Sequence, residues 1–195
     1  MTFRLLTIII CGVVIQGCSG LQNIPLVWKP TSDIYDSNAG TVTTFFDQKF
    51  RVMPFSDGRD NKSEIAKNVE GSSPKLVTTK DDVAVWCTDR FKEILRQHGL
   101  TLVDSNETVV LKGEVLQFYV LEDTRYKGMV GIKLTAESLA GVNLWQGVLT
   151  GTAKRFGRSY SQDNYYETLS DSFLNAIQSL MKNEDFKNAL MRKTL

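Results

Sequence analysis

Apolar residues recur along the chain with two periods, and each period predicts a different kind of element. The strand-like stretches, which alternate or run apolar over a dozen or so residues, are 108–121, 126–137 and 144–156. Short polar turns separate them, a pattern typical of an antiparallel meander. Shorter strands are expected at 49–55 and 100–103, and residues 56–77 are expected to form a long irregular loop.

Two other stretches carry apolar residues at the spacing of amphipathic helices. The first begins at residues 78–82, where Thr offers a cap and two Asp favour the positive end of the helix dipole; it runs to His98, before Gly99. The second begins near Asn164, with Glu167 placed for a capping box. A last short helix follows its own polar cap.

This order of elements predicts an α+β fold in two layers. We expect a mainly antiparallel sheet of four to five strands with two long helices packed on one face, in the order β-α-β-β-β-β-α-α. A lipid-binding variant of this fold would need an apolar groove between helices and sheet. Gly113, Gly147 and Gly151 would leave room for such a groove under aromatic side chains.

The first twenty residues form a separate segment. Arg4 precedes a mostly apolar stretch at 5–15, which suits a secretory signal and is shorter than the ~20 residues of a membrane-spanning helix. The run at 15–18, Ile-Gln-Gly-Cys, resembles the lipobox of bacterial lipoproteins. This resemblance implies cleavage before Cys18, a diacylglycerol on its sulfur and an acyl group on its new amino group. In the enteric sorting rule, Ser19 would then direct the protein to the outer membrane; the alternative is an ordinary signal peptide that releases a soluble protein.

The chain is thus expected to have three parts: a signal peptide at 1–17, the lipidated Cys18 with a tether at 18–45, and a single periplasmic domain at 46–192. The tether shows no sustained period. It carries apolar residues that would dock on the domain or on a partner. These residues are Leu26, Val27, Trp28 and Tyr35.

Composition excludes several classes of protein. With 42% hydrophobic and 23% charged residues, the chain is neither disordered nor a polytopic membrane protein. Its 23 basic and 22 acidic side chains give a net charge of +1, so no basic excess recruits nucleic acid or predicts a polybasic lipid-binding patch. The expected partners are the membrane, through the lipid anchor, and an envelope protein, but not nucleic acid.

The sequence carries no Walker A, dinucleotide-binding, H-E-x-x-H or G-x-S-x-G motif. His98 is the only histidine, and we expect it to cap helix carbonyls or to sit in water rather than to serve catalysis. Cys87 falls on an apolar helix face, which predicts a buried thiol. The acidic residues of the 56–77 loop are expected to be solvated charges rather than metal ligands. We therefore expect no enzyme, no metal and no cofactor besides the covalent lipid on Cys18.

Two places are candidate partner contacts because Arg and Tyr are the residue types that anchor interfaces. One lies in the predicted loop and the other leads into the last long helix. The candidate residues are Asp57, Arg59, Asp60, Arg155, Arg158, Tyr160 and Tyr165. The alternative for both places is fold maintenance, with Asp57 and Arg59 holding the loop in place.

Several segments together resemble the YajG-like family of bacterial lipoproteins. They are VMPFSDGRD (52–60), VTTKDDVAVWCTDRFKEILRQHG (77–99), GEVLQFYV (113–120) and RFGRSYSQDNYYETLSDSFLNAIQSLMKNEDFKNAL (155–190). The resemblance covers nearly all of the mature domain and brings no catalytic residues with it. It implies a non-enzymatic interaction or accessory component of the envelope, facing the periplasm. The layout is also similar to lipopolysaccharide-assembly and ABC-transporter auxiliary lipoproteins, which implies the alternative of a lipid- or glycolipid-binding auxiliary module.

Overall fold

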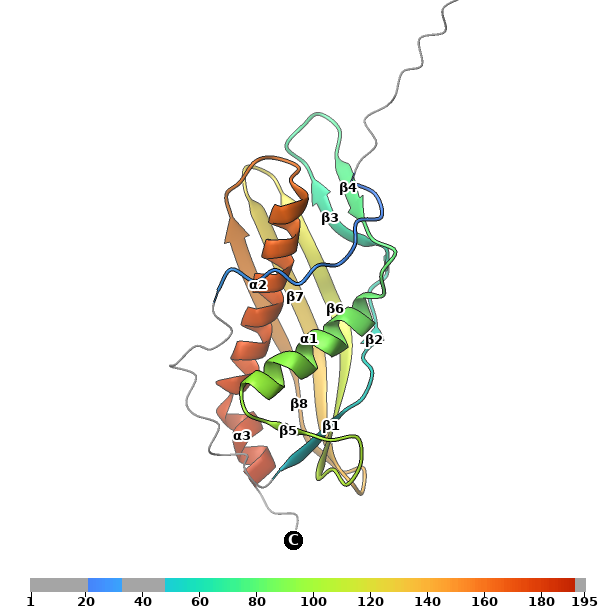
Figure 1. Ribbon diagram of the computed structural model, residues 1–195, viewed down its shortest axis with the longest axis vertical. Helices are drawn as coiled ribbons and strands as arrows, with labels where there is room; N and C mark the ends of the chain where they lie inside the picture. The colour runs from blue at the N-terminus through green and yellow to red at the C-terminus, as the bar shows by residue number, and fades with distance from the viewer. Residues whose placement is uncertain (1–20, 33–47, 192–195) are drawn as a thin grey trace, which may run out of the picture.

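Three long strands form the centre of the molecule, and they pair antiparallel along nearly their whole length (Figure 1). They are β6 (Val109–Glu122), β7 (Tyr126–Ser138) and β8 (Asn143–Arg155). The computed structural model describes residues 21–32 and 48–191. At ~3.3 Å per residue, the 14 residues of β6 span about 45 Å and set the long axis of the molecule. The meander expected from the sequence is confirmed.

Short strands line the other edge of β6 and make the sheet mixed. Three of them lie parallel to β6, one after another: β1 (Lys49–Val52), β2 (Ser56–Asp57) and β3 (Glu64–Asn68). Two more extend the sheet outward: β4 (Lys75–Thr78), antiparallel to β3, and β5 (Thr101–Leu102), parallel to β1. Together they give a sheet of eight strands.

The expectation of an irregular loop at 56–77 is wrong, since β2, β3 and β4 lie within it. These strands have two, five and four residues. A strand of this length is too short to show a clear alternation of apolar and polar residues. The order of β2 and β3 comes from hydrogen bonds to β6, which is remote in sequence, and that of β4 from pairing with β3. Local patterns do not encode the pairing with β6.

Three helices lie on one face of the sheet: α1 (Val83–Gln97), α2 (Gln162–Met181) and α3 (Glu184–Met191). In Figure 1, α2 runs along the sheet and α1 crosses it obliquely. The α+β class and the helices on one face are confirmed. α2 packs tightly against β8 at Gly151, where a Cβ would lie 2.0 Å from the carbonyl oxygen of Ser172 and 2.3 Å from the amide nitrogen of Ala176.

The other two glycines also have no free space beside them. A Cβ on Gly113 would lie 2.5 Å from the ring of Phe55, and a Cβ on Gly147 would lie 2.5 Å from the ring of Trp145. The space that the lipid-binding alternative would need at Gly113, Gly147 and Gly151 is therefore not open. The missing side chains let neighbouring rings and the α2 backbone come closer, so the space is filled by protein.

The helix ends follow the predicted chemistry with two differences. Asp82, rather than a threonine, caps α1, and its carboxylate accepts hydrogen bonds from the backbone N–H groups of Ala84 and Val85. Gly99 follows this helix with φ of +82°, the left-handed conformation expected of a C-terminal stop. The second helix begins at Gln162, earlier than expected, and its Glu167 forms ion pairs with other elements instead of a capping box.

Candidate interaction surfaces

Residues 21–32 form an extended segment, here called the N-terminal strap, that lies across the helical face (Figure 1). Its start is held beside the end of β4. The carbonyl of Leu21 accepts a hydrogen bond from the Thr78 N–H (3.1 Å), and the Ile24 N–H donates to the Thr78 carbonyl (2.9 Å). The Leu21 N–H also donates to the Tyr160 hydroxyl. Leu21 is thus fixed between β4 and the loop that precedes α2.

The middle of the strap is anchored by an aromatic cluster. The ring of Trp28 meets Trp86 of α1 edge-on, with centroids 5.7 Å apart, and Phe173 of α2 at 6.3 Å. Edge-to-face contacts at these distances stabilise beyond the apolar area that they bury. Of the two sites considered for the tether, the domain is therefore the one that this segment occupies. Tyr35 lies outside the described residues.

The end of the strap is held by charged groups of α2. Lys29 pairs with Glu167 (3.0 Å), and the Thr31 N–H donates to the Asp171 carboxylate (2.7 Å). Arg155, one of the predicted partner contacts, pairs with the same two acidic side chains, at 2.5 and 3.3 Å. The structure therefore gives Arg155 a role inside the fold.

A buried carboxylate organises the loop before α2. Glu122 ends β6 with 1% of its surface exposed. It accepts hydrogen bonds from the Tyr165 hydroxyl, the Tyr160 N–H (2.8 Å) and the Ser159 hydroxyl (2.9 Å). Burial opposes ionisation of Glu122, but these hydrogen bonds outweigh it and hold the pKa of the carboxyl below its usual value. The network fixes the loop and the first turn of α2.

Tyr165 and Tyr160, both predicted partner contacts, belong to this network. Tyr165 is fully buried, and burial with the neighbouring Glu122 raises the pKa of its hydroxyl. Tyr160 adopts a φ of +55°, and the ammonium of Lys75 lies 5.2 Å from the centre of its ring. Sequence reasoning missed Glu122, although strand alternation places it on the same buried face as Phe118 and Val120.

Of the four candidate contacts that lead into α2 (Arg155, Arg158, Tyr160 and Tyr165), Arg158 is the one with an exposed side chain. Its backbone carbonyl accepts a hydrogen bond from the Tyr126 hydroxyl (2.7 Å), which holds the loop while the guanidinium reaches solvent. Nearby, the ring of Phe156 is 71% exposed and lies 4.5 Å from the guanidinium of Arg125. This loop therefore presents an aromatic ring and basic groups at the surface.

Arg59, in the connection between β2 and β3, is buried, with 8% of its surface exposed. It donates two hydrogen bonds to the Asp57 carboxylate (3.0 and 2.8 Å) and others to the carbonyls of Lys62 and Glu64. Burial opposes ionisation of Asp57, but its hydrogen bonds with Arg59 dominate and lower its pKa. These contacts favour fold maintenance for both residues, whereas Asp60 beside them is exposed.

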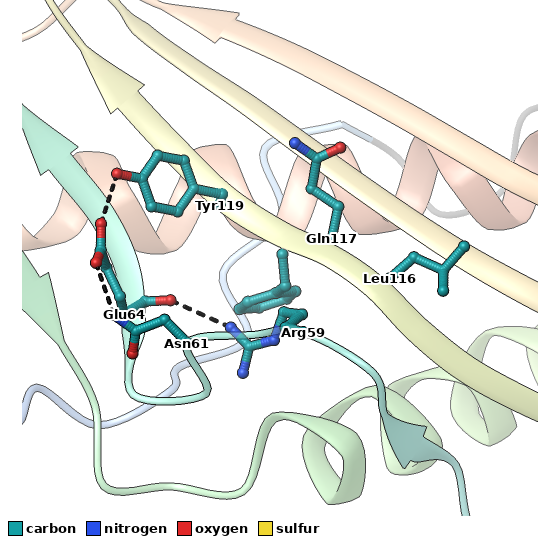
Figure 2. Close-up of a pocket in the computed structure, with 7 residues that line it drawn as sticks. Arg59, Asn61, Glu64, Leu116, Gln117 and Tyr119 are labelled. Atoms are coloured by element: carbon teal, nitrogen blue, oxygen red, sulfur yellow. Dashed lines mark hydrogen bonds between the residues drawn. The ribbon is translucent and has the colours of Figure 1, made fainter.

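A small pocket of about 250 Å³ lies next to Arg59, where the edge of β6 passes from β2 to β3 (Figure 2). Among the described residues, no strand pairs with 116–119 on this side, because β2 stops opposite Val115 and β3 begins pairing at Val120. Figure 2 shows Tyr119 pointing toward Glu64, to which its hydroxyl donates (2.8 Å). The polar groups thus bind one another, and the pocket is smaller than the ~300–1,000 Å³ of usual ligand sites.

Within residues 21–32 and 48–191, no three His, Cys, Asp or Glu side chains gather as a metal site would require. Cys87 is buried, as expected, and burial raises the pKa of its thiol. His98 is also buried, which excludes the alternative that it sits in water; it follows α1 as the C-cap residue, and burial lowers its pKa. No helix of the described residues has the length and apolar character needed to cross a membrane.

The face of the central strands opposite the helices carries exposed apolar side chains. The residues are Leu116 and Leu121 on β6, Met129 on β7 and Val148 on β8, each between 37% and 57% exposed. Leu121 lies diagonally across the ladder from Met129, whose direct partner is Tyr119, and Val148 pairs with Lys133 farther along β7. We call this set of residues the open face. Exposed apolar side chains on one face of a sheet can form part of an interaction surface.

No protein-family model and no curated protein matches the sequence. Among solved structures, a DUF330 protein from Xanthomonas campestris aligns with a TM-score of 0.52 at 8% identity, over 74% of this chain and 85% of that one. The dodecameric PelC from Paraburkholderia phytofirmans aligns at 0.45 and 15% identity, over 69% and 86%. A candidate lipoprotein from Caulobacter crescentus gives 0.39 and 10%, over 66% and 92%. The first of these similarities shows a shared fold.

Proposed function

We propose that the protein is a lipoprotein of the cell envelope, anchored through lipid on Cys18 to the outer membrane and facing the periplasm. Its role is to bind an envelope protein, without catalysis of its own. The N-terminal segment with its lipobox-like run supports the anchor. The resemblance to the YajG-like family supports the same assignment.

The open face is the observation that carries the binding role. Its apolar groups lie on β6, β7 and β8, and the backbone of these strands is held rigidly by ladder hydrogen bonds on both sides of β7. A rigid surface with exposed apolar side chains can bind a partner with little loss of conformational entropy. By contrast, a lipid-carrying role finds no groove at Gly113, Gly147 and Gly151, where protein atoms fill the space.

The anchor is tested by the intact mass of the protein extracted from membranes of its native host. We expect the mass of residues 18–195 plus a diacylglycerol and an acyl group. Cys18→Ala should prevent this modification, so that no lipidated mature chain is recovered from the membrane fraction. Cys87→Ala is the control, because the buried thiol of Cys87 has no part in anchoring. An unmodified, soluble wild-type chain would contradict the anchor.

The binding role is tested by photo-crosslinking in the native host from position 129 on the open face. We expect the Met129 position, 45% exposed, to yield a discrete crosslinked protein band. Val148→Asp should abolish this band and leave the melting temperature within about 2 °C, since exposed substitutions cost at most ~0.5 kcal/mol. Val85→Asp is the matched control, because Val85 is equally exposed on α1. A band that survives Val148→Asp would remove the open face from the proposal.

A further inference from the structure

The distance between the proposed anchor and the folded domain is short. Leu21 is fixed by its hydrogen bonds to Thr78 and Tyr160, and only two residues separate it from Cys18. A fully extended chain spans at most ~3.6 Å per residue, so Cys18 lies within about 11 Å of Leu21. The expected tether at 18–45 is therefore docked on the domain from residue 21 through residue 32.

This distance decides which end of the molecule meets the membrane. The headgroup layer beside the hydrocarbon core is only about 5–7 Å thick on each side of a bilayer. A lipidated Cys18 places its acyl chains in the hydrocarbon, so Leu21 and the groups that hold it lie at or just above the headgroups. Those groups are the end of β4 and the loop before α2, in the upper part of Figure 1.

Three connections meet at this end, here called the proximal end: 69–74, 123–125 and 156–161. The register brings them together, since Asn68 pairs with both Lys75 and Glu122, and Tyr126 pairs with Arg155. The Ser159 hydroxyl links the connections further, because it contacts the carboxylates of both Glu70 and Glu122.

The charges at the proximal end are not balanced, although those of the whole chain are. The basic side chains there are Lys75, Arg125, Lys127, Lys154 and Arg158, and the acidic ones that reach the surface are Glu70, Asp123 and, in the first turn of α2, Asp163. Within the described part of the chain, the side chains of Arg125 and Arg158 form no ion pair. Each basic group near an anionic membrane surface adds attraction worth about a fivefold change in affinity.

An exposed aromatic ring accompanies these charges. Phe156 is 71% exposed, and its ring carries the guanidinium of Arg125 on one face at 4.5 Å. An aromatic ring beside a basic group suits the interface between headgroups and hydrocarbon, where the ring is buried and the charge meets phosphate. The opposite end of the sheet, at the β7–β8 turn, exposes Leu139 and Val142 and has no basic residue in that turn.

We propose that the proximal end is a membrane-docking surface for anionic phospholipid headgroups, which holds the domain upright on the leaflet with the β7–β8 turn facing away. This inference rests on lipidation of Cys18 and adds an orientation to the proposed function. Because β6 spans about 45 Å, the β7–β8 turn then lies roughly that far above the membrane.

The orientation is tested with a fluorescent probe on the lipidated mature chain in vesicles of phosphatidylethanolamine and phosphatidylglycerol. The probe is attached to Gly71→Cys at the proximal end, where a Cβ meets no other atom within 4 Å, or to Leu139→Cys at the opposite end. Cys87 is buried and does not compete for the label. We expect spin-labelled lipid to quench the probe at 71 several-fold more strongly than the probe at 139.

Charge is tested in the same vesicles with Arg125→Glu combined with Arg158→Glu. We expect this pair to reduce quenching at position 71 severalfold while the acyl chains keep the protein on the vesicle. Lys49→Glu combined with Arg96→Glu is the matched control, because it makes the same change in net charge at exposed positions away from the proximal end. On vesicles of phosphatidylcholine alone, the chain with its native arginines should show quenching at position 71 as weak as that of the Arg125→Glu, Arg158→Glu variant on anionic vesicles.

The possible outcomes distinguish a failure of the docking surface from a failure of the lipid anchor on which it rests. A chain that lacks the acyl mass and does not float with vesicles overturns both the anchor and the docking surface. A lipidated chain that floats, but shows equal quenching at positions 71 and 139, overturns the docking surface alone. Equal effects of the two charge-reversal pairs also overturn it, since a general charge effect would then replace a local one.

Discussion

Replacing Gly151 by alanine is expected to destabilise the protein by about 3 kcal/mol and to lower its melting temperature by roughly 6–12 °C. The added Cβ would lie 2.0 Å from the carbonyl oxygen of Ser172 and 2.3 Å from the amide nitrogen of Ala176. Both are backbone atoms of α2, so a side chain cannot rotate aside to make room. The helix or the strand must shift as a whole. Thermal unfolding followed by circular dichroism measures the effect.

Gly71→Ala is the matched control for this substitution. The two variants add the same methyl group, but a Cβ at Gly71 has nothing within 4 Å. We expect its melting temperature to stay level or to rise slightly, because alanine reduces the entropy of the unfolded chain. Equal melting temperatures for the two variants would show that α2 does not press against β8 as described.

Replacing Arg59 by alanine is expected to cost about 3–5 kcal/mol, the usual loss when one partner of a buried ion pair is removed. The side chains of Arg59 and Asp57 are only 7% and 11% exposed, so the remaining carboxylate would be left buried without its counter-charge. The carbonyls of Lys62 and Glu64 would lose their donors as well. Denaturant unfolding gives the free energy directly.

Arg158→Ala is the comparison for this experiment. Both arginines are candidate partner contacts on sequence grounds, but the side chain of Arg158 is exposed and its substitution should change stability by no more than ~0.5 kcal/mol. A stable Arg59→Ala variant that loses crosslinking to its partner would contradict fold maintenance and assign Arg59 to the interface.

The long elements were predictable because their signals are local. Alternation over a dozen residues specifies β6 to β8, and the apolar stripe with a polar cap specifies α1. The short strands β2 and β3, which were not predicted, depend instead on β6, which follows them by many residues. The positions of Gly113, Gly147 and Gly151 were visible, but whether the space beside a glycine is empty or filled depends on three-dimensional packing.

For a similar reason, some of the candidate contact residues lie inside the fold and others at its surface. Arg and Tyr anchor interfaces, but they also anchor the interior of a protein when a carboxylate is available there. Asp57, the partner of Arg59, lies close to it in sequence, and fold maintenance by this pair was the alternative interpretation. The partners of Arg155 and Tyr165 are Asp171 and Glu122, and only the folded chain brings Glu122 to Tyr165. The strap has no periodic pattern because its hydrogen bonds are made with residues distant in sequence.

The strap also has a consequence for the order in which the protein is completed. Its hydrogen bonds to Tyr160, Ser170 and Asp171 join residues 139 to 141 positions apart along the chain. Contacts of such separation slow folding, because a long loop must close before they form. A chain that is synthesised from its N-terminus presents the strap first and its binding site last. The strap therefore stays accessible to chaperones and proteases until α2 has been made, and the native state closes only when synthesis is nearly complete.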